Sequence, residues 1–319
     1  MIRIFVPACI ALCIPAIPTA SAQEYPSKPI RLIVPYPPGG GVDATGRVIG
    51  QALTEQLGQS VIVENRAGAT GRIGTEIVAK SPADGYTLLL GSGAPNAVIP
   101  SVTPNLPYDA IRDFAPISLV GKTDYTLAVH PSLPVRSVKE LIAFAKAKPG
   151  QLTYGSSGIL SNTHLCGELL NQMAKVDVVH VAYKGTGPAL LSVLAGETAM
   201  SYGGGGAIMP HVTARRLRAL ATTGTTRRSP DLPTMSETLP GYHVNQWYGV
   251  IAPAGTPPAI LDRLHKEIVR AVANPKIVQQ LTSLDTDAVA NSPREFSALI
   301  KSEIEKWAKV VKASNIRLD

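Results

Sequence analysis

The sequence Ile30-Arg-Leu-Ile-Val-Pro-Tyr-Pro-Pro-Gly-Gly-Gly41 contains the pattern from which the rest of the architecture can be predicted. It starts as a short apolar strand and ends in a turn made of prolines and glycines. Beyond the turn, apolar residues return near helical spacing, at Val42, Val48, Ile49, Ala52 and Leu53. A strand, a glycine-rich turn and a helix in this order are typical of a mostly parallel sheet with helices on its faces.

The same order of elements recurs along the chain. Further strands are predicted at Val61–Val63 and Tyr86–Leu90, and the pattern restarts after about residue 124. That second run contains a capped helix from Ser137, strands at 152–154, 178–181, 198–202 and 217–221, and helices at 163–173 and 188–194. Helices at 257–272 and from Ser292 onward end the sequence, and such a helical tail usually packs back on the first domain. We therefore predict an α/β fold with two lobes.

The composition is that of a globular protein, with 319 residues, 45% apolar and 17% charged. Lys and Arg number 30 against 23 Asp and Glu, which gives a net charge of +7. The basic residues are scattered, and the tightest groups are Arg215-Arg216-x-Arg218 and Arg227-Arg228. A nucleic-acid surface needs a denser stripe of positive charge, so we expect no nucleic-acid partner.

The first 22 residues have the pattern of an export signal. Arg3 precedes a mostly apolar run from Ile4 to Ile17, and Thr19-Ala-Ser-Ala22 provides a small-residue cleavage site. The run contains three prolines and is shorter than the roughly 20 apolar residues of a membrane span. We expect residues 1–22 to be a signal peptide, cleaved near Ala22 and Gln23, and the mature protein to be exported. Cys166 is then the sole thiol, which excludes an internal disulfide.

The glycine turn allows two interpretations. Gly39-x-Gly41-x-x-Ala44 approximates a dinucleotide-binding motif, but two prolines crowd the turn and the third glycine is missing. Glycines still let a backbone approach a ligand closely, and the amides of a helix N-terminus attract an anion. The turn is therefore either an anion-binding loop or a tight connection that binds nothing. We expect no cofactor, and the six histidines give no metal pair.

A second loop, Gly155-Ser-Ser-Gly158, raises the possibility of a serine hydrolase. A nucleophile elbow requires Gly-x-Ser-x-Gly, and neither Ser156 nor Ser157 is flanked in that way. A loop rich in hydroxyl groups at the start of a helix is more often a cap or a ligand clamp. A hydrolase that uses Ser156 or Ser157 remains the alternative to a binding protein, and we expect no catalytic residue.

Several motifs, found in order along nearly the whole chain, together resemble one family. They are Pro35-Tyr-Pro-Pro-Gly-Gly-Gly-Val-Asp43, Glu64-Asn-Arg-Ala-Gly68 with Gly71-x-x-Gly74, Asp84-Gly-Tyr-Thr-Leu88, Gly155-Ser-Ser-Gly-x-x-Ser161-x-x-His164-Leu, Val181-Ala-Tyr-Lys-Gly185-x-x-Pro188-Ala189, Leu217-Arg-Ala-Leu-Ala221, Ala252-Pro-Ala-Gly-Thr-Pro257 and Glu303-x-x-Lys-Trp307. The set is similar to the Bug-type periplasmic solute-binding proteins of the tripartite tricarboxylate transporter family.

The resemblance implies a periplasmic binding protein of type II, with two α/β lobes and a hinged ligand cleft. Such a protein closes over a small carboxylate and presents it to the membrane subunits of its transporter. The family pattern assigns residues 23–123 plus 224–319 to a discontinuous first lobe and 124–223 to the second. We expect a monomer.

In the family, backbone amides, hydroxyls and bridging waters hold the ligand carboxylates. Carried onto this chain, one jaw of the cleft comprises Tyr36, Pro38, Gly39, Gly40, Gly41, Ala69, Thr70 and Gly71. The other comprises Ser156, Ser157, Ser161, Thr163 and His164.

The run Gly203-Gly-Gly-Gly206 departs from the family pattern, in which an aromatic residue is commonly followed by Asp. Gly203 lacks the acidic side chain that would hold an ammonium, which argues against an amino-acid ligand. Gly203 and Gly204 would also widen the cleft, since glycine leaves room for a larger molecule. The ligand is thus expected to be a di- or tricarboxylate, with an aromatic dicarboxylate such as terephthalate as the bulkier choice.

Overall fold

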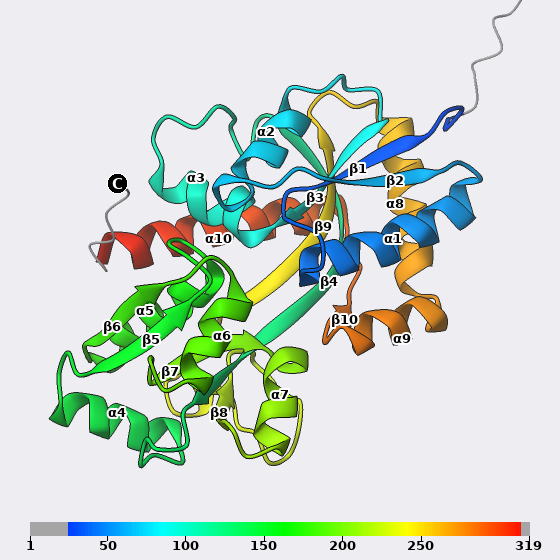
Figure 1. Cartoon of the computed structure of the whole chain (residues 1–319). Coiled ribbons are helices and arrows are strands. Elements are labelled where there is room, and N and C mark those ends of the chain that lie inside the picture. The colour runs from blue at the N-terminus through cyan, green and yellow to red at the C-terminus, as the bar shows by residue number, and fades with distance from the viewer. Residues whose placement is uncertain (1–24, 314–319) are drawn as a thin grey trace, which may run out of the picture.

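The structure is a computed structural model that describes residues 25–313, so the predicted signal peptide lies outside it. Its ribbon divides into an upper and a lower body, joined by two long strands (Figure 1). The upper body is built from both ends of the described chain. Its elements are β1 (Ile30–Val34), α1 (Gly41–Leu57), β2 (Val61–Asn65), η1 (Ala69–Gly71), α2 (Arg72–Ala79), β3 (Thr87–Ser92), η2 (Ala94–Val98), α3 (Ile99–Val102), α8 (Pro258–Val272), α9 (Pro275–Ser283), β10 (Asp287–Ala288) and α10 (Pro293–Ala313).

The lower body comes from the middle of the chain. It contains α4 (Val138–Ala147), β5 (Leu152–Ser156), α5 (Asn162–Ala174), β6 (Val178–Ala182), α6 (Thr186–Leu194), β7 (Met200–Gly204), α7 (Gly205–Thr213) and β8 (Arg218–Thr222), followed by the short turn η3 (Met235–Glu237). The predicted helices and strands lie within a few residues of these bounds, and the α/β class is confirmed.

One continuous path of strands runs through both bodies, in the order β2-β1-β3-β9-β4-β7-β5-β6. The outer strands are parallel to their neighbours: β1 pairs with β2 and β3 in the upper body, and β5 pairs with β6 and β7 in the lower body. The central strands β4 (Phe114–Val129) and β9 (Asn245–Pro253) are antiparallel to theirs. The parallel units place the carboxyl ends of their strands, and the loops that follow them, toward the junction of the two bodies.

Strand β4 crosses from one body to the other. Its residues up to Asp124 pair with β9, and those from Tyr125 onward pair with β7 and β8. The chain returns to the upper body through β9, which pairs antiparallel with β4 over residues 114–124. Near this crossing the Thr223 amide donates to the Tyr125 carbonyl at 2.8 Å, and Thr223 Oγ1 donates to the Val244 carbonyl at 2.5 Å. Two strands side by side therefore connect the bodies.

Each body has its own buried core. In the upper body, apolar residues of β1 and β3 pack against α1 and α8, and they include Leu32, Leu88, Leu53 and Leu264. The lower core forms around Leu127, Tyr154, Leu165 and Tyr202. Within residues 25–313, no helix is both long and apolar enough to cross a membrane.

Helix α10 packs on the upper body, as the sequence predicted for the helical tail, and also on the lower body. Phe296 and Ile300 are buried in the upper body with Trp247. Trp307 and Val310 belong to the lower core. A helix of 21 residues is roughly 30 Å long at 1.5 Å per residue, so it extends beyond one body and reaches the other (Figure 1).

Candidate functional site

The loop between β1 and α1 is held in shape by a buried carboxylate. Asp43, in the first turn of α1, accepts a hydrogen bond from the Gly39 amide at 2.9 Å and another from Asn65 Nδ2 at 2.9 Å. Arg47 Nε donates to the same side chain at 3.0 Å, and Asn65 Nδ2 also donates to the Tyr36 carbonyl. Burial raises the pKa of Asp43, but the bonds from Arg47, Gly39 and Asn65 outweigh it and leave the pKa below its usual value. Asp43 is therefore a permanent anion that fixes the loop.

The same loop leaves backbone amides exposed at the start of α1. The first amides of a helix have no acceptor within the helix. Gly40 precedes α1 in extended backbone, and a Cβ added there would meet no heavy atom of residues 25–313 within 4 Å. A Cβ on Gly41 would lie 3.2 Å from Tyr248 Oη. The glycines thus border open space that a ligand can enter, whereas the Gly39 amide is already bound to Asp43.

The loop between β2 and α2 packs beside this turn. Ala69 and Thr70 are exposed and have positive φ angles of 47° and 55°, and Gly71 is buried. A Cβ on Gly71 would lie 3.3 Å from Tyr36 Cζ, so the two loops are in contact. Tyr36 Oη lies 3.2 Å from Ser92 Oγ, at the end of the next strand. The predicted residues of the first jaw therefore lie on two loops that are in contact, with Ser92 at the end of β3 beside them.

Ser157, Ser161 and Thr163 form one hydrogen-bonded group in the β5–α5 loop. Thr163 Oγ1 lies 2.9 Å from Ser157 Oγ and 3.0 Å from Ser161 Oγ. Ser161 caps α5 by accepting from the His164 amide at 3.2 Å. Thr163 is buried and Ser157 is partly exposed, so Ser157 is the member of this group most open to a ligand. The structure brings these predicted residues together. Their hydrogen bonds to one another stabilise the loop itself.

Two histidines stack next to this loop, His164 buried and His180 partly exposed. The rings of His164 and His180 lie 3.8 Å apart and nearly parallel, and His164 Nδ1 accepts from the Leu160 amide at 3.0 Å. His180 Nε2 is 2.6 Å from Ser156 Oγ, a contact that the sequence analysis missed. His164 Nε2 is 3.6 Å from Glu168, four residues along the helix. Within residues 25–313, no group of three His, Cys, Asp or Glu side chains could hold a metal ion.

The glycine run at the end of β7 and the start of α7 does not widen the space in the way the sequence suggested. A Cβ on Gly203 would point into the apolar cluster of the lower body, 3.0 Å from Ile208 Cδ1. The predicted room at Gly203 is therefore absent, because Ile208 fills it. Gly204 differs, since a Cβ there would have no heavy atom of the described residues within 4 Å.

Side chains from the central strands add polar groups that the sequence analysis did not select. Asn162 Nδ2 donates to Gln246 Oε1 at 2.5 Å, and Tyr125 Oη donates to the same oxygen at 3.4 Å. A Cβ on Gly93, after β3, would lie 3.3 Å from Asn162 Nδ2, so upper and lower bodies meet here. No local motif marks Tyr125 or Gln246, because they come from strands that meet only in the folded chain.

The tyrosines around the glycine turn are neutral at physiological pH. Burial raises the pKa of Tyr36 to about 12, against the opposing effect of its Ser92 hydrogen bond. Burial likewise raises the pKa of Tyr125 and of Tyr248 above its usual value. The junction therefore offers amides and neutral hydroxyls, which suit an acceptor such as a carboxylate.

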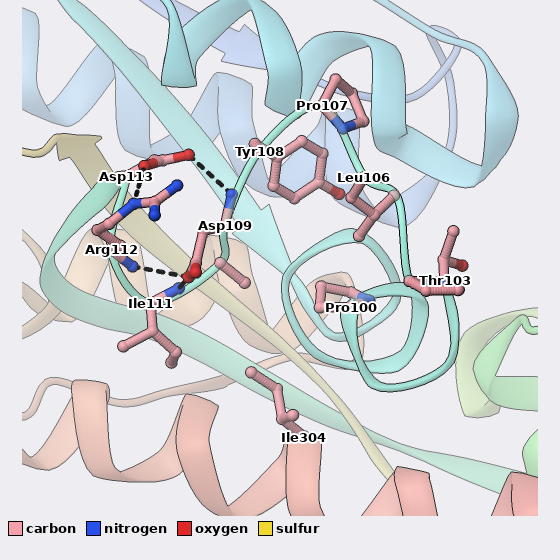
Figure 2. Close-up of a pocket in the computed structure, with 12 residues that line it drawn as sticks. Pro100, Thr103, Leu106, Pro107, Tyr108, Asp109, Ile111, Arg112, Asp113 and Ile304 are labelled. Carbon is pink, nitrogen blue, oxygen red and sulfur yellow. Dashed lines mark hydrogen bonds and ion pairs between the residues drawn. The ribbon is translucent and has the colours of Figure 1, made fainter.

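A separate pocket of about 480 Å³ lies between the loop from Thr103 to Asp113, α3 and Ile304 of α10 (Figure 2). None of the predicted site residues lines it. Asp109 Oδ1 accepts from the Ile111 and Arg112 amides, and these bonds shape the pocket wall. Its connection to the glycine turn is indirect, through Tyr108 Oη, which donates to the Pro95 carbonyl at 2.7 Å.

Comparison with known proteins agrees with this geometry. Residues 45–316 match the model of the tripartite tricarboxylate transporter family receptor. Protein BugT of Bordetella pertussis is 39% identical over 302 residues, which cover 93% of each chain.

Solved structures of similar proteins have the same fold as this chain. The R. palustris protein Rpa4515 with adipate has a TM-score of 0.83 at 34% identity and covers 92% of this chain and 99% of its own. MatC from Rhodopseudomonas palustris with bound malate has a TM-score of 0.79 at 28% identity. The match covers 90% of this chain and 100% of MatC. The predicted binding-protein fold is confirmed, and this chain belongs to the receptors of the tripartite tricarboxylate transporter family.

Proposed function

We propose that this protein captures a small carboxylate between two lobes and delivers it to the membrane subunits of a tripartite tricarboxylate transporter. The observation that carries the proposal is the glycine turn before α1. Asp43 holds its shape, and the space next to Gly40 is open. A carboxylate placed there would accept the free amides of the helix start and gain from the helix dipole.

The lobes in this proposal are residues 23–123 plus 224–319 and residues 124–223. The strands β4 and β9 between them serve as the hinge. A ligand that contacts both lobes shifts the equilibrium toward the closed form by its differential affinity for that form. Closure removes water from the carboxylate and replaces it with fixed amide and hydroxyl dipoles.

The proposed ligand-binding residues surround this junction, and no Lys or Arg is among them. They are Tyr36, Pro38, Gly39, Gly40, Gly41, Ala69, Thr70, Gly71, Ser156, Ser157, Ser161, Thr163, His164, Gly203 and Gly204, to which we add Tyr125, Gln246 and Tyr248. Ser156, Ser161 and His164 are buried, so we assign them to the support of the loop. The amide of Gly41, the hydroxyl of Ser157 and the hydroxyl of Tyr248 are the donors that we expect to touch the ligand.

The ligand class is a small di- or tricarboxylate. Two relatives were solved with adipate and with malate, which supports an aliphatic dicarboxylate. An aromatic dicarboxylate such as terephthalate receives less support than the sequence suggested, because Ile208 fills the space beside Gly203. We further propose that the protein is exported, acts as a monomer in the periplasm and makes or breaks no covalent bond.

A thermal-shift titration of the mature protein tests this function. Adipate, malate and terephthalate are compared with adipamide, which has the same carbon chain as adipate but no charge. A ligand that binds only the native state raises the unfolding midpoint with increasing concentration. We expect at least one carboxylate to do so and adipamide to have no effect. A midpoint that none of the carboxylates changes, or that adipamide raises equally, would contradict carboxylate capture.

A further inference from the structure

The N-terminus of helix α7 is occupied by a carboxylate of the chain itself. Asp285 Oδ2 accepts a hydrogen bond from the Gly205 amide, the first residue of α7, at 2.6 Å. The two residues are 80 positions apart, in the α9–β10 turn and after β7. Asp285 belongs to the proposed first lobe and Gly205 to the second. The contact therefore joins the two lobes.

The position of Asp285 is fixed by its own turn and by one arginine. Its φ of 57° is unusual for a residue other than glycine, and its amide donates to the Thr282 carbonyl at 2.9 Å. Arg228 Nη1 donates to Asp285 Oδ1 at 3.0 Å. The same guanidinium also contacts Asp287 at 2.9 Å and Asp124 at 3.5 Å. Three carboxylates thus share one cation, and this part of the junction is negative.

The glycine at position 205 is explained by this contact. A Cβ there would lie 2.7 Å from Asp285 Oδ2, closer than a carbon can approach an oxygen without displacement. Any side chain at position 205 would displace the carboxylate. The glycine run, which the sequence analysis interpreted as room for a bulky ligand, gives access to an internal anion at this position.

The turn that contains Asp285 lies close to Tyr248 of the proposed ligand site. A Cβ on Gly121 would lie 2.5 Å from Thr286 Cγ2 and 3.8 Å from Tyr248 Cδ2. Together with burial and with Tyr36, the charge of Asp285 raises the pKa of the Tyr248 hydroxyl. Tyr248 Oη in turn lies 3.2 Å from the position of a Cβ on Gly41. The N-termini of α1 and α7 therefore border the same junction, one with free amides and the other already bound to Asp285.

We propose that Asp285 is a specificity-determining residue, which fills the anion position at the N-terminus of α7 and excludes a ligand carboxylate from it. The specificity role rests on the proposed function, whereas the contact between Asp285 and the Gly205 amide does not depend on it. Asp285 then limits where a ligand carboxylate can bind. The carboxylates of the ligand bind at the α1 turn and near Ser157. The ligand group that faces α7 is neutral or cationic, since a second anion there would meet Asp285 in a partly desolvated site.

Chemical rescue with formate tests whether Asp285 fills the anion position at the N-terminus of α7. The test does not require the ligand to be known. Asp285→Ala removes the internal carboxylate and leaves the Gly205 amide free, and formate is the smallest carboxylate that can replace it. We expect the variant to unfold several degrees below the parent and to regain most of that loss in formate at about 0.1 M. Asp287→Ala is the matched control, because Asp287 contacts Arg228 as Asp285 does and is more exposed. Formate should not rescue it.

Equal stabilisation of the parent, Asp285→Ala and Asp287→Ala by formate would overturn the proposal. So would an Asp285→Ala variant that is as stable as the parent. If Asp285→Ala does not fold, Asp285→Asn replaces it, since an amide oxygen can still accept from Gly205. Formate should then stabilise Asp285→Asn no more than the parent, and a selective gain would contradict an already filled position.

Selectivity between two ligand probes tests the consequence for the ligand. Adipate and 6-aminohexanoate both have six carbons and one carboxylate end, and at the other end adipate has a second carboxylate where 6-aminohexanoate has an ammonium group. Asp285→Asn should raise the ratio of adipate affinity to 6-aminohexanoate affinity by about tenfold, as expected for loss of a nearby partly buried charge, and Asp287→Asn should change it less. An unchanged ratio in Asp285→Asn would contradict the specificity role. If neither probe binds the parent, the proposed function fails for these ligands, and the formate result still decides whether Asp285 fills the position.

Discussion

Ser156 Oγ and His180 Nε2 lie 2.6 Å apart, which is the separation of a nucleophile and its general base. Ser156 is fully buried, however, and its Oγ also accepts from the Gly158 amide at 3.1 Å. A substrate carbonyl cannot reach a hydroxyl in this position without opening the loop. The pair therefore supports the β5–α5 loop, and it does not favour the hydrolase alternative.

This interpretation predicts the behaviour of an esterase assay. The parent protein and Ser156→Ala should release nitrophenol from p-nitrophenyl acetate at the same slow rate, equal to that of the buffer with an unrelated protein. Ser156→Ala should nevertheless be less stable by about 1 kcal/mol, because it loses buried hydrogen bonds. A parent rate well above background that the substitution abolishes would restore the hydrolase.

Stability should depend on pH through His180. Burial and the neighbouring His164 ring lower the pKa of His180 to about 4, from an ordinary value of 6.5. Between these values the unfolded chain binds a proton that the folded chain does not, so stability falls as pH falls from 6.5 to 4. Urea unfolding of the parent and of His180→Gln at pH 7 and pH 4.5 measures this difference. The parent should lose more stability on acidification, and equal losses would show that His180 is not held neutral.

Asp43 should control both the shape of the glycine turn and the affinity for ligand. Asp43→Ala leaves the Gly39 amide without its acceptor and removes one of the two acceptors of Asn65 Nδ2, which should cost about 1–3 kcal/mol in urea unfolding. Carboxylate binding, measured by calorimetry, should weaken because the α1 amides are no longer held in place. Asp262→Ala, on the exposed face of α8, serves as the control. Undiminished affinity in Asp43→Ala would mean that the turn holds its shape without the carboxylate.

Gly203 and Gly204 should respond differently to the same substitution. Gly203→Asp points its side chain at Ile208 and buries a charge in an apolar cluster, so its unfolding midpoint should fall by several degrees. The side chain of Gly204→Asp points into open space, so the unfolding midpoint of this variant should stay close to that of the parent. If Gly203→Asp were stable and selectively weakened an aromatic dicarboxylate, the bulky-ligand interpretation would return.

The parallel strands and their loops could be predicted because they are local. Each apolar run ends in a glycine or hydroxyl turn before a helix, and β1, β5 and α5 lie where the sequence predicts them. The central strands could not be predicted in this way. In β4, the polar run from Lys122 to Asp124 interrupts the apolar pattern at the crossing between the bodies. The central strands β4 and β9 were therefore missed, whereas β7 and β8, which pair antiparallel with β4, were predicted.

The candidate site was predictable to the same extent. Loops that follow parallel strands meet at one edge, so the glycine turn, Gly71 and Ser157 could be proposed as site residues from their motifs and the family resemblance. Tyr248 approaches the turn, and Gln246 reaches Asn162, only through the register of β9 with its neighbours. Asp285 reaches Gly205 across 80 residues, and no local pattern carries that contact.

The central claim is that free amides beside Gly40 bind the carboxylate, and a calorimetric titration of Gly40→Val tests it most directly. Gly40 has extended backbone, with φ of −86° and ψ of 169°, and open space around it, so valine should fit without unfolding the protein. Its side chain should occupy the space in front of α1, and Gly40→Ala should have an intermediate effect. We expect the carboxylate that binds the parent most tightly to lose at least a hundredfold in affinity in Gly40→Val. Unchanged affinity in a folded Gly40→Val variant would contradict the claim and leave the turn as a connection only.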